Sequence, residues 1–131
     1  AKMKNKGKGF SLMELMIVIS IVAIMLSLSY PSYKSFVRKS NRAEAIVTLL
    51  DWANEQAIWR ADNPSYSNAF NPATGDLYAY TIVSNAVSFT LTATAINDQA
   101  ADKEDGISCG VMTLNQAGTS GPSGYETCWS Q

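Results

Sequence analysis

An uncharged apolar stretch near the N-terminus constrains this chain more than any other feature. Residues 15–30 carry no charged side chain, and the apolar run extends back to Phe10. The whole run is about 20 residues long, which is close to the length of helix that a lipid bilayer requires. It predicts a membrane-inserting helix, and Glu14 places a single carboxylate within it.

Charge is divided unevenly along the 131 residues. Four lysines precede the apolar run, whereas six basic and eleven acidic side chains follow Gly9, so the net charge of −1 conceals an acidic body. A basic run before an apolar run is typical of a membrane-targeted N-terminus whose basic end stays in the cytoplasm. An acidic body argues against DNA as a partner, although DNA binding stays open as an alternative.

Three interpretations fit the N-terminal segment 2–30. A secretory signal would be cleaved after Ser29 and would release a soluble periplasmic binding domain. An ordinary single-span anchor would be retained whole. In the third interpretation a processing enzyme removes the basic leader, and the apolar helix stays attached to the protein.

Glu14 favours the third interpretation. A charged side chain within an apolar segment costs about 2.5–3.5 kcal/mol on insertion scales, and a plain signal or anchor gains nothing from that cost. Removing the leader would expose the α-amino group of Phe10, whose pKa of about 8 keeps it largely charged at neutral pH. That amine could neutralise Glu14 of a neighbouring copy, which would fix the register of the two chains while adding little stability.

The string KGKGFSLMELMIVISIVAI, residues 6–24, resembles the class III leader and N-terminal helix of type IV pilins. The resemblance is dense over residues 4–46, and the short basic leader agrees with it. It implies that a prepilin peptidase cuts after Gly9 and that the new N-terminal Phe10 is methylated. Glu14 would then guide subunit registration.

The resemblance also assigns a role to Pro31, which would kink or interrupt the helix in a filament. From the residues themselves, a helix is predicted to continue past Pro31 to about Asp62, with a kink or break at the proline. Apolar residues recur there at three- and four-residue spacing. The stripe consists of Ala43, Ile46, Val47, Leu50, Ala53, Ala57 and Ile58, with Arg42, Asp51, Glu55 and Arg60 largely on the other side.

A basic cluster follows the apolar run at helical spacing and consists of Lys34, Arg38, Lys39 and Arg42. We expect these side chains to contact lipid headgroups or acidic patches on neighbouring subunits. Their position on the exported side of the span makes the second role the more natural one.

The C-terminal half has the pattern of an antiparallel sheet. Residues 63–77 predict a loop, and strands are predicted at 78–83, 87–96 and 111–115. The acidic segment 97–108 predicts a solvated loop, because its spacing does not match that of an EF-hand calcium loop.

Cys109 and Cys128 are the only cysteines, and the chain contains no histidine. In an exported protein such a pair predicts one disulfide, worth about 3 kcal/mol in the chain-entropy model, with two free buried cysteines as the alternative. The ending from Cys109 to Trp129 also resembles the disulfide-bounded loop of type IVa pilins. With no histidine and no nucleophile elbow, we expect neither an enzyme nor a metal or cofactor site.

Together these observations predict an α+β pilin fold, in which a long, partly transmembrane helix packs on a C-terminal antiparallel sheet. Residues 1–9 would form the cleaved leader and residues 10–31 the transmembrane and filament-core helix. Residues 32–62 would form the amphipathic second half of that helix. Residues 63–131 would hold the loop, the sheet and the disulfide-bounded C-terminal loop.

The resemblance implies a structural subunit of a type IV pilus that serves adhesion, twitching motility or DNA uptake. Its partners would be copies of itself and other pilins, the prepilin peptidase, the inner-membrane assembly platform and, before assembly, membrane lipid. The precursor would cross the inner membrane once and end in an extracellular pilus. A pseudopilin of a type II secretion system is the first alternative, although the Cys109–Cys128 bracket leans against it, and the soluble periplasmic domain is the second.

Overall fold

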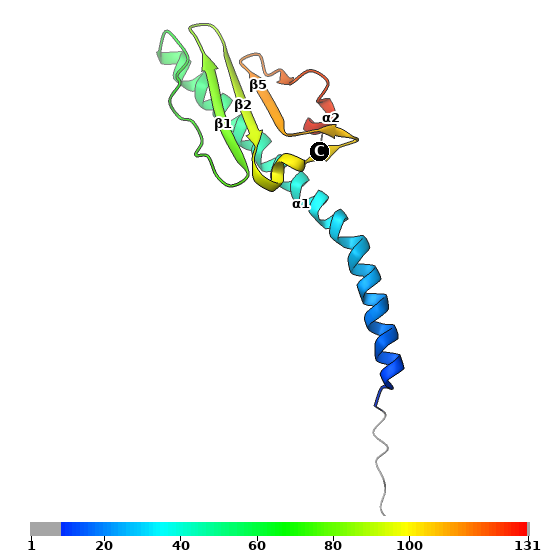
Figure 1. The fold of residues 1–131 in the computed structure, drawn as a ribbon. Helices are drawn as coiled ribbons and strands as arrows, with labels where there is room; N and C mark the ends of the chain where they lie inside the picture. Colours follow the sequence, from blue (N-terminus) through cyan, green and yellow to red (C-terminus); the bar gives the residue numbers. More distant parts are fainter. Residues whose placement is uncertain (1–8, 131) are drawn as a thin grey trace, which may run out of the picture. The chain divides into compact units, whose positions relative to one another are not determined.

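The computed structural model describes residues 9–130, and the first eight residues of the predicted leader lie outside that part. The chain divides into two compact units, residues 1–34 and 35–131, and helix α1 (Leu12–Asp62) contributes to both (Figure 1). The predicted end of the helix at Asp62 is therefore confirmed. The helix is assigned without interruption through Pro31, so there is no break there, while a kink at the proline stays a prediction.

The N-terminal unit consists, in its described part, of the first turns of α1. Every side chain from Gly9 to Tyr33 is exposed. The hydroxyl groups of three serines in this stretch donate to backbone carbonyls within the same helix, as Ser20 does to Met16 at 2.7 Å. The polar atoms of these serines are thus satisfied locally, as an apolar surrounding requires. By length and composition, α1 contains a stretch that could cross a membrane.

The second unit contains a four-stranded antiparallel sheet in the order β1-β2-β5-β6. The strands are β1 (Tyr78–Ser84), β2 (Phe89–Ala95), β5 (Val111–Asn115) and β6 (Ser120–Gly121). A small hairpin of β3 (Lys103–Glu104) and β4 (Ile107–Ser108) lies between η1 (Asn97–Ala101) and β5, and α2 (Glu126–Trp129) follows β6. The three predicted strands are present, the second being shorter than expected.

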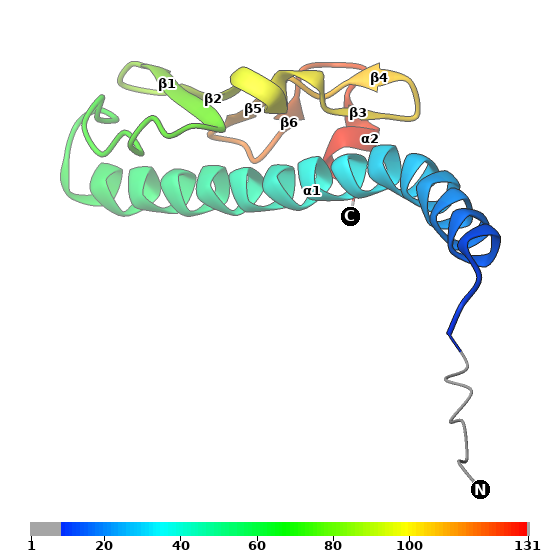
Figure 2. The same cartoon turned by 60° about the horizontal axis from the view of Figure 1, so that its bottom comes forward.

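The core of this unit lies between the sheet and the second half of α1, which Figure 2 shows as a layer beneath the strands. In β2, apolar and threonine side chains alternate, so one face of the strand is buried and the other is turned outward. The buried set includes Leu91, Ala93, Met112 and Leu114 from the sheet with Ala45, Leu49 and Trp52 from α1. Burial of this shared surface is what holds the helix against the sheet.

The face of α1 that packs on the sheet differs from the predicted stripe. Ile46 is buried as expected, but Val47, Leu50 and Ile58 are more than half exposed. Leu49 and Trp52 take their place in the core, and Arg42, which was predicted on the outer side, is completely buried. The spacing of apolar residues was compatible with burial of more than one face of α1. Contacts with the sheet, which is distant in sequence, decide which face of the helix is covered.

The loop between α1 and β1 is fastened to the helix by a buried amide. The Nε2 atom of Gln56 donates to the carbonyl of Ser67 at 2.7 Å, and the backbone N–H of Ser67 donates to Gln56 Oε1 at 3.0 Å. These two bonds satisfy both ends of an amide group that is removed from water. The predicted loop is therefore irregular in conformation but fixed in position on α1.

Candidate assembly site

Glu14 lies in the first turn of α1, where it takes part in a reciprocal capping arrangement. The backbone N–H of Glu14 donates to Ser11 Oγ at 3.2 Å, and the backbone N–H of Ser11 donates to Glu14 Oε2 at 3.4 Å. This is a capping box, and a carboxylate is also favoured electrostatically at a helix N-terminus. Sequence reasoning missed Ser11, although a serine three residues before a glutamate at the start of an apolar run is the known signal.

The predicted processing residues lie directly before this cap. Gly9 and Phe10 precede the helix in a segment without regular secondary structure, and Phe10 has 74% of its surface exposed. Within residues 9–130, no ion pair joins Glu14 to a cation. The carboxylate is thus held at the helix end by weak local bonds and is exposed to any neighbouring molecule.

The apolar surface that follows is continuous around the helix. From Leu12 to Leu28 the large side chains are all about half to three-quarters exposed, and no residue of the candidate membrane span is buried within the structure. A monomeric soluble protein does not present a surface of this kind. Such a helix requires either lipid or other apolar helices around it.

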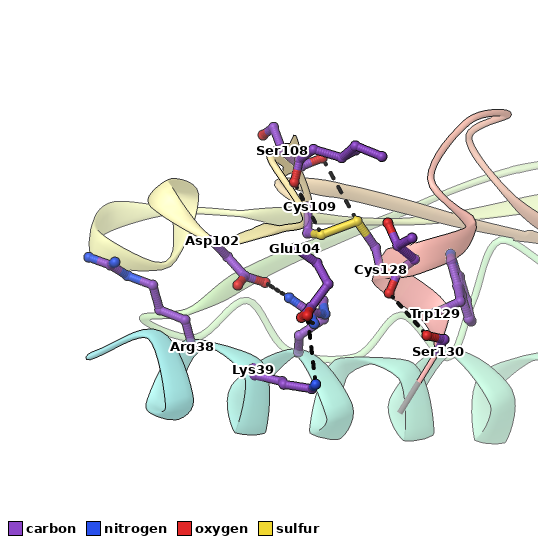
Figure 3. Close-up of a disulfide and its surroundings, with 12 residues drawn as sticks. Arg38, Lys39, Asp102, Glu104, Ser108, Cys109, Cys128, Trp129 and Ser130 are labelled. Atoms are coloured by element: carbon purple, nitrogen blue, oxygen red, sulfur yellow. Dashed lines mark hydrogen bonds and ion pairs between the residues drawn. A yellow bond between two sulfur atoms is a disulfide. The ribbon is translucent and has the colours of Figure 1, made fainter. Parts of the chain in front are cut away.

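A second group of charged residues joins α1 to the C-terminal part of the chain. Arg42 on α1 donates from Nη1 to Asp102 and from Nη2 to Glu104, both at 2.6 Å. The side chain of Arg42 is completely buried and Asp102 is 2% exposed, whereas Glu104 is partly open to solvent. Asp102 and Glu104 come from the segment before the first cysteine, so this cluster fastens that segment to the helix (Figure 3).

The electrostatic environment of this cluster is consistent with a paired charge. Burial alone would lower the pKa of Arg42, but its hydrogen bonds to Asp102 and Glu104 and their negative charges raise the pKa above the ordinary value. The hydrogen bond from Arg42 holds the pKa of Glu104 below its ordinary value, and Lys39 at 3.7 Å adds to the effect. Arg42 and Glu104 are therefore both charged at neutral pH.

Two predictions about these charges are corrected by the structure. Three members of the basic cluster form ion pairs with acidic residues of their own chain: Arg38, Lys39 and Arg42. The distance from Arg38 Nη2 to Asp98 is 3.1 Å. To contact lipid headgroups or neighbouring subunits, these side chains would first have to give up these intramolecular partners. The acidic segment is only partly a solvated loop: it contains η1 and the β3–β4 hairpin, and Asp102 is buried, whereas Asp98 and Asp105 are exposed. Within residues 9–130, no group of three or more acidic or sulfur ligands is arranged to hold a metal ion.

The predicted disulfide joins Cys109 to Cys128, with an S–S distance of 1.99 Å and both cysteines fully buried (Figure 3). Cys109 lies between β4 and β5, and Cys128 lies in α2. The indole N–H of Trp129 donates to the carbonyl of Gly121 at 3.0 Å, which holds α2 beside β6. The C-terminal segment is therefore closed covalently at one place and anchored by Trp129 at another.

Comparisons with known proteins agree with these features. Residues 31–113 match the family model described as "Type IV minor pilin ComP, DNA uptake sequence receptor", and residues 4–30 match the prokaryotic N-terminal methylation motif. The fimbrial protein EcpC of Eikenella corrodens is 34% identical over 68 residues, which cover 47% of this chain and 44% of the relative. The type IV major pilin protein PilE of Neisseria gonorrhoeae is 27% identical over 111 residues, which cover 78% and 66% of the two chains.

A solved structure confirms the predicted α+β fold. A type IV pilin from Shewanella oneidensis superposes with a TM-score of 0.57 and 21% sequence identity, covering 72% of this chain and 99% of that one. The curated relatives are longer, since the chain spans about half to two thirds of their length. The likeness therefore extends from the N-terminal motif into the sheet.

Proposed function

Because this chain belongs to the type IV pilin family, we propose that it is a structural subunit of a type IV pilus filament. The observation that carries the proposal is the exposed apolar half of α1, which begins directly after the methylation motif. Such a surface can be covered first by lipid and later by the same helices of other subunits. Its role is mechanical, and no catalytic chemistry is assigned to it.

In the membrane stage, the four leader lysines hold the N-terminus in the cytoplasm while the helix inserts. A prepilin peptidase cuts between Gly9 and Phe10, and the new amine of Phe10 is methylated. The capping box between Ser11 and Glu14 supports this stage, because it satisfies backbone donors at the helix end and lowers the cost of carrying a carboxylate there.

In the assembly stage, the inner-membrane platform transfers the apolar helix from lipid into a filament of copies and other pilins. The Phe10 amine of one subunit then neutralises Glu14 of its neighbour. A buried ion pair contributes little net stability, but a shifted register would leave both charges unpaired in an apolar surrounding. The pair therefore selects one arrangement among many that would bury the apolar helix equally well.

The two alternative functions have less support. A soluble periplasmic domain would lose the apolar N-terminal part of α1 by cleavage after Ser29. The methylation motif covers residues 4–30 and so includes that part of the helix, which argues against its removal. A secretion pseudopilin would share the N-terminus, but the match over residues 31–113 is to a pilin family.

Replacing Gly9 by serine should block processing, because the assigned cut follows this glycine. The mature protein of the unchanged chain should begin at Phe10 with a methylated amine, whereas the variant should keep the whole leader and accumulate in the membrane. Intact-mass and N-terminal peptide mass spectrometry measure this directly. Gly7→Ser is the matched control and should be processed normally; a mature chain that starts at Tyr30, or a Gly9 variant of unchanged mature mass, contradicts the proposal.

DNA binding is a second candidate function, favoured by the description of the matching family as a DNA uptake sequence receptor. Most cations of the second unit are already engaged, and Lys103 is the one between residues 35 and 130 whose side chain has no ion pair or hydrogen bond in the described part of the chain. Phosphate contacts should therefore be few. They would involve Lys103 and the half-buried Arg38 and Lys39 after an exchange of partners.

We expect weak duplex binding by the leader-free protein, with a log–log salt slope no steeper than about −3, since each of at most three phosphate contacts contributes about −0.9. Fluorescence anisotropy of a labelled duplex between about 50 and 200 mM salt measures the slope. Lys103→Ala should make it shallower by about one. A slope of about −5 or steeper would show that cations now paired with acidic residues or carbonyls of their own chain bind phosphate instead. That result would contradict the expectation of few phosphate contacts.

A further inference from the structure

Two aromatic rings lie exposed together where the end of α1 meets the loop that follows it. The ring centroids of Trp59 and Phe70 are 5.4 Å apart at an interplanar angle of 66°. The exposed fractions of the two residues are 38% and 48%. With Ile58 and Glu55 they line an open hollow of about 260 Å³. Exposed aromatic side chains at a hollow are the groups on which protein partners most often anchor.

The backbone of Phe70 is held in an unfavourable conformation at this place. Its φ angle is 69°, in the left-handed region that bulky side chains rarely adopt. Such a conformation costs free energy and persists only where the surroundings enforce it. In this conformation the ring of Phe70 lies against Trp59 at the surface and is about half exposed.

The rim of the hollow is negatively charged. Glu55 lines it and forms no ion pair within residues 9–130. Three further carboxylates, Glu44, Asp51 and Asp62, lie on the same flank of α1, because the four are spaced by seven, four and seven residues. The nearest cation along the helix is directed elsewhere: Arg60 donates to the carbonyls of Ala86 and Asn63 at 3.0 and 2.9 Å. The hollow thus has acidic and aromatic groups and no basic side chain in its lining.

We propose that this hollow binds the guanidinium group of an arginine side chain presented by a partner protein. A guanidinium is planar and cationic, so it can stack on the rings of Trp59 and Phe70 while it donates two hydrogen bonds to the carboxylate of Glu55. An anionic group would meet the acidic flank, and a neutral one would leave Glu55 without a counter-charge. This inference is independent of the filament role, since every contributing residue lies in the second unit.

The experiment uses the full chain in a nonionic detergent and two short capped peptides that differ only in one residue, arginine or its neutral isostere citrulline. The three tryptophans give separate indole N–H signals by NMR, and the Trp59 signal is identified by its loss in Trp59→Phe. We expect the arginine peptide to shift the Trp59 signal saturably and the citrulline peptide to bind at least about tenfold more weakly.

Two carboxylate variants test whether the charge acts locally. Glu55→Gln keeps the shape of the hollow and should weaken arginine-peptide binding by about tenfold. Glu126→Gln removes another exposed carboxylate, at α2, and should leave binding unchanged. The proposal is overturned if the arginine peptide causes no saturable shift of the Trp59 signal, if citrulline binds as well as arginine, or if Glu55→Gln binds like the unchanged chain.

Discussion

Replacing Arg42 by methionine should lower the free energy of unfolding of the second unit by about 3–5 kcal/mol. The guanidinium of Arg42 is fully buried and holds Asp102, which is itself 2% exposed, at 2.6 Å. Without it, one carboxylate is left in the interior without a counter-charge, which is far more costly than losing an exposed pair. Denaturant unfolding of the full chain in detergent, followed by near-UV circular dichroism, measures the change.

The neighbouring Lys39 provides the control for this prediction. Its ammonium group lies 3.7 Å from Glu104 and its side chain is 45% exposed, so Lys39→Met should cost no more than about 1 kcal/mol. Combining Arg42→Met with Asp102→Leu should recover much of the lost stability, because an apolar pair can replace a buried ion pair at little cost. Equal losses in the two single variants would contradict the role assigned to the buried pair.

The same cluster should make stability depend on pH in a defined direction. Because the pKa of Glu104 is lowered in the folded state, its contribution is present above the unfolded value of 4.5 and is lost as pH falls through the folded value. The Arg42 variant lacks the main cause of that shift. The unfolding free energy of the unchanged chain should therefore exceed that of Arg42→Met by less below pH 4.5 than it does at pH 7.

Arg42 also shows what could not be predicted from local sequence. Its partner Asp102 is 60 residues away along the chain, so helical periodicity placed the arginine with the polar residues and the aspartate in a solvated loop. Each assignment followed from the residue type alone. Only the folded chain brings the two charges together, and their pairing helps to decide which face of α1 is covered.

Features that depend on local pattern were predictable in much greater detail. The uncharged run predicted the exposed apolar helix. Alternation in residues 89–95 predicted the half-buried strand, and two cysteines in an exported chain predicted the disulfide. Ser11 and Glu14 also have the spacing of a capping box, a local pattern that is compatible with an intermolecular role for the same carboxylate.

That local partner gives Glu14 two separable roles, and replacing it by alanine should reveal the larger one. Glu14→Ala should leave membrane insertion intact or improve it, because a charge is removed from the apolar segment. Incorporation into filaments should fall by about a hundredfold or more, since the Phe10 amine of the neighbour would be buried without a counter-charge at a cost of about 3–5 kcal/mol. The measurement is the ratio of this subunit in sheared filaments to that in the membrane fraction.

Ser11→Ala separates registration from capping. It removes the hydroxyl that accepts the backbone N–H of Glu14 but keeps the carboxylate, so the helix should lose only about 1 kcal/mol of cap stability. If Glu14 fixes register between chains, the Ser11 variant assembles nearly as well as the unchanged protein, while Glu14→Gln fails although it can still accept the cap bond from Ser11. Equal defects in the serine and glutamate variants would instead assign Glu14 to the helix end of its own chain, and the registration role would be wrong.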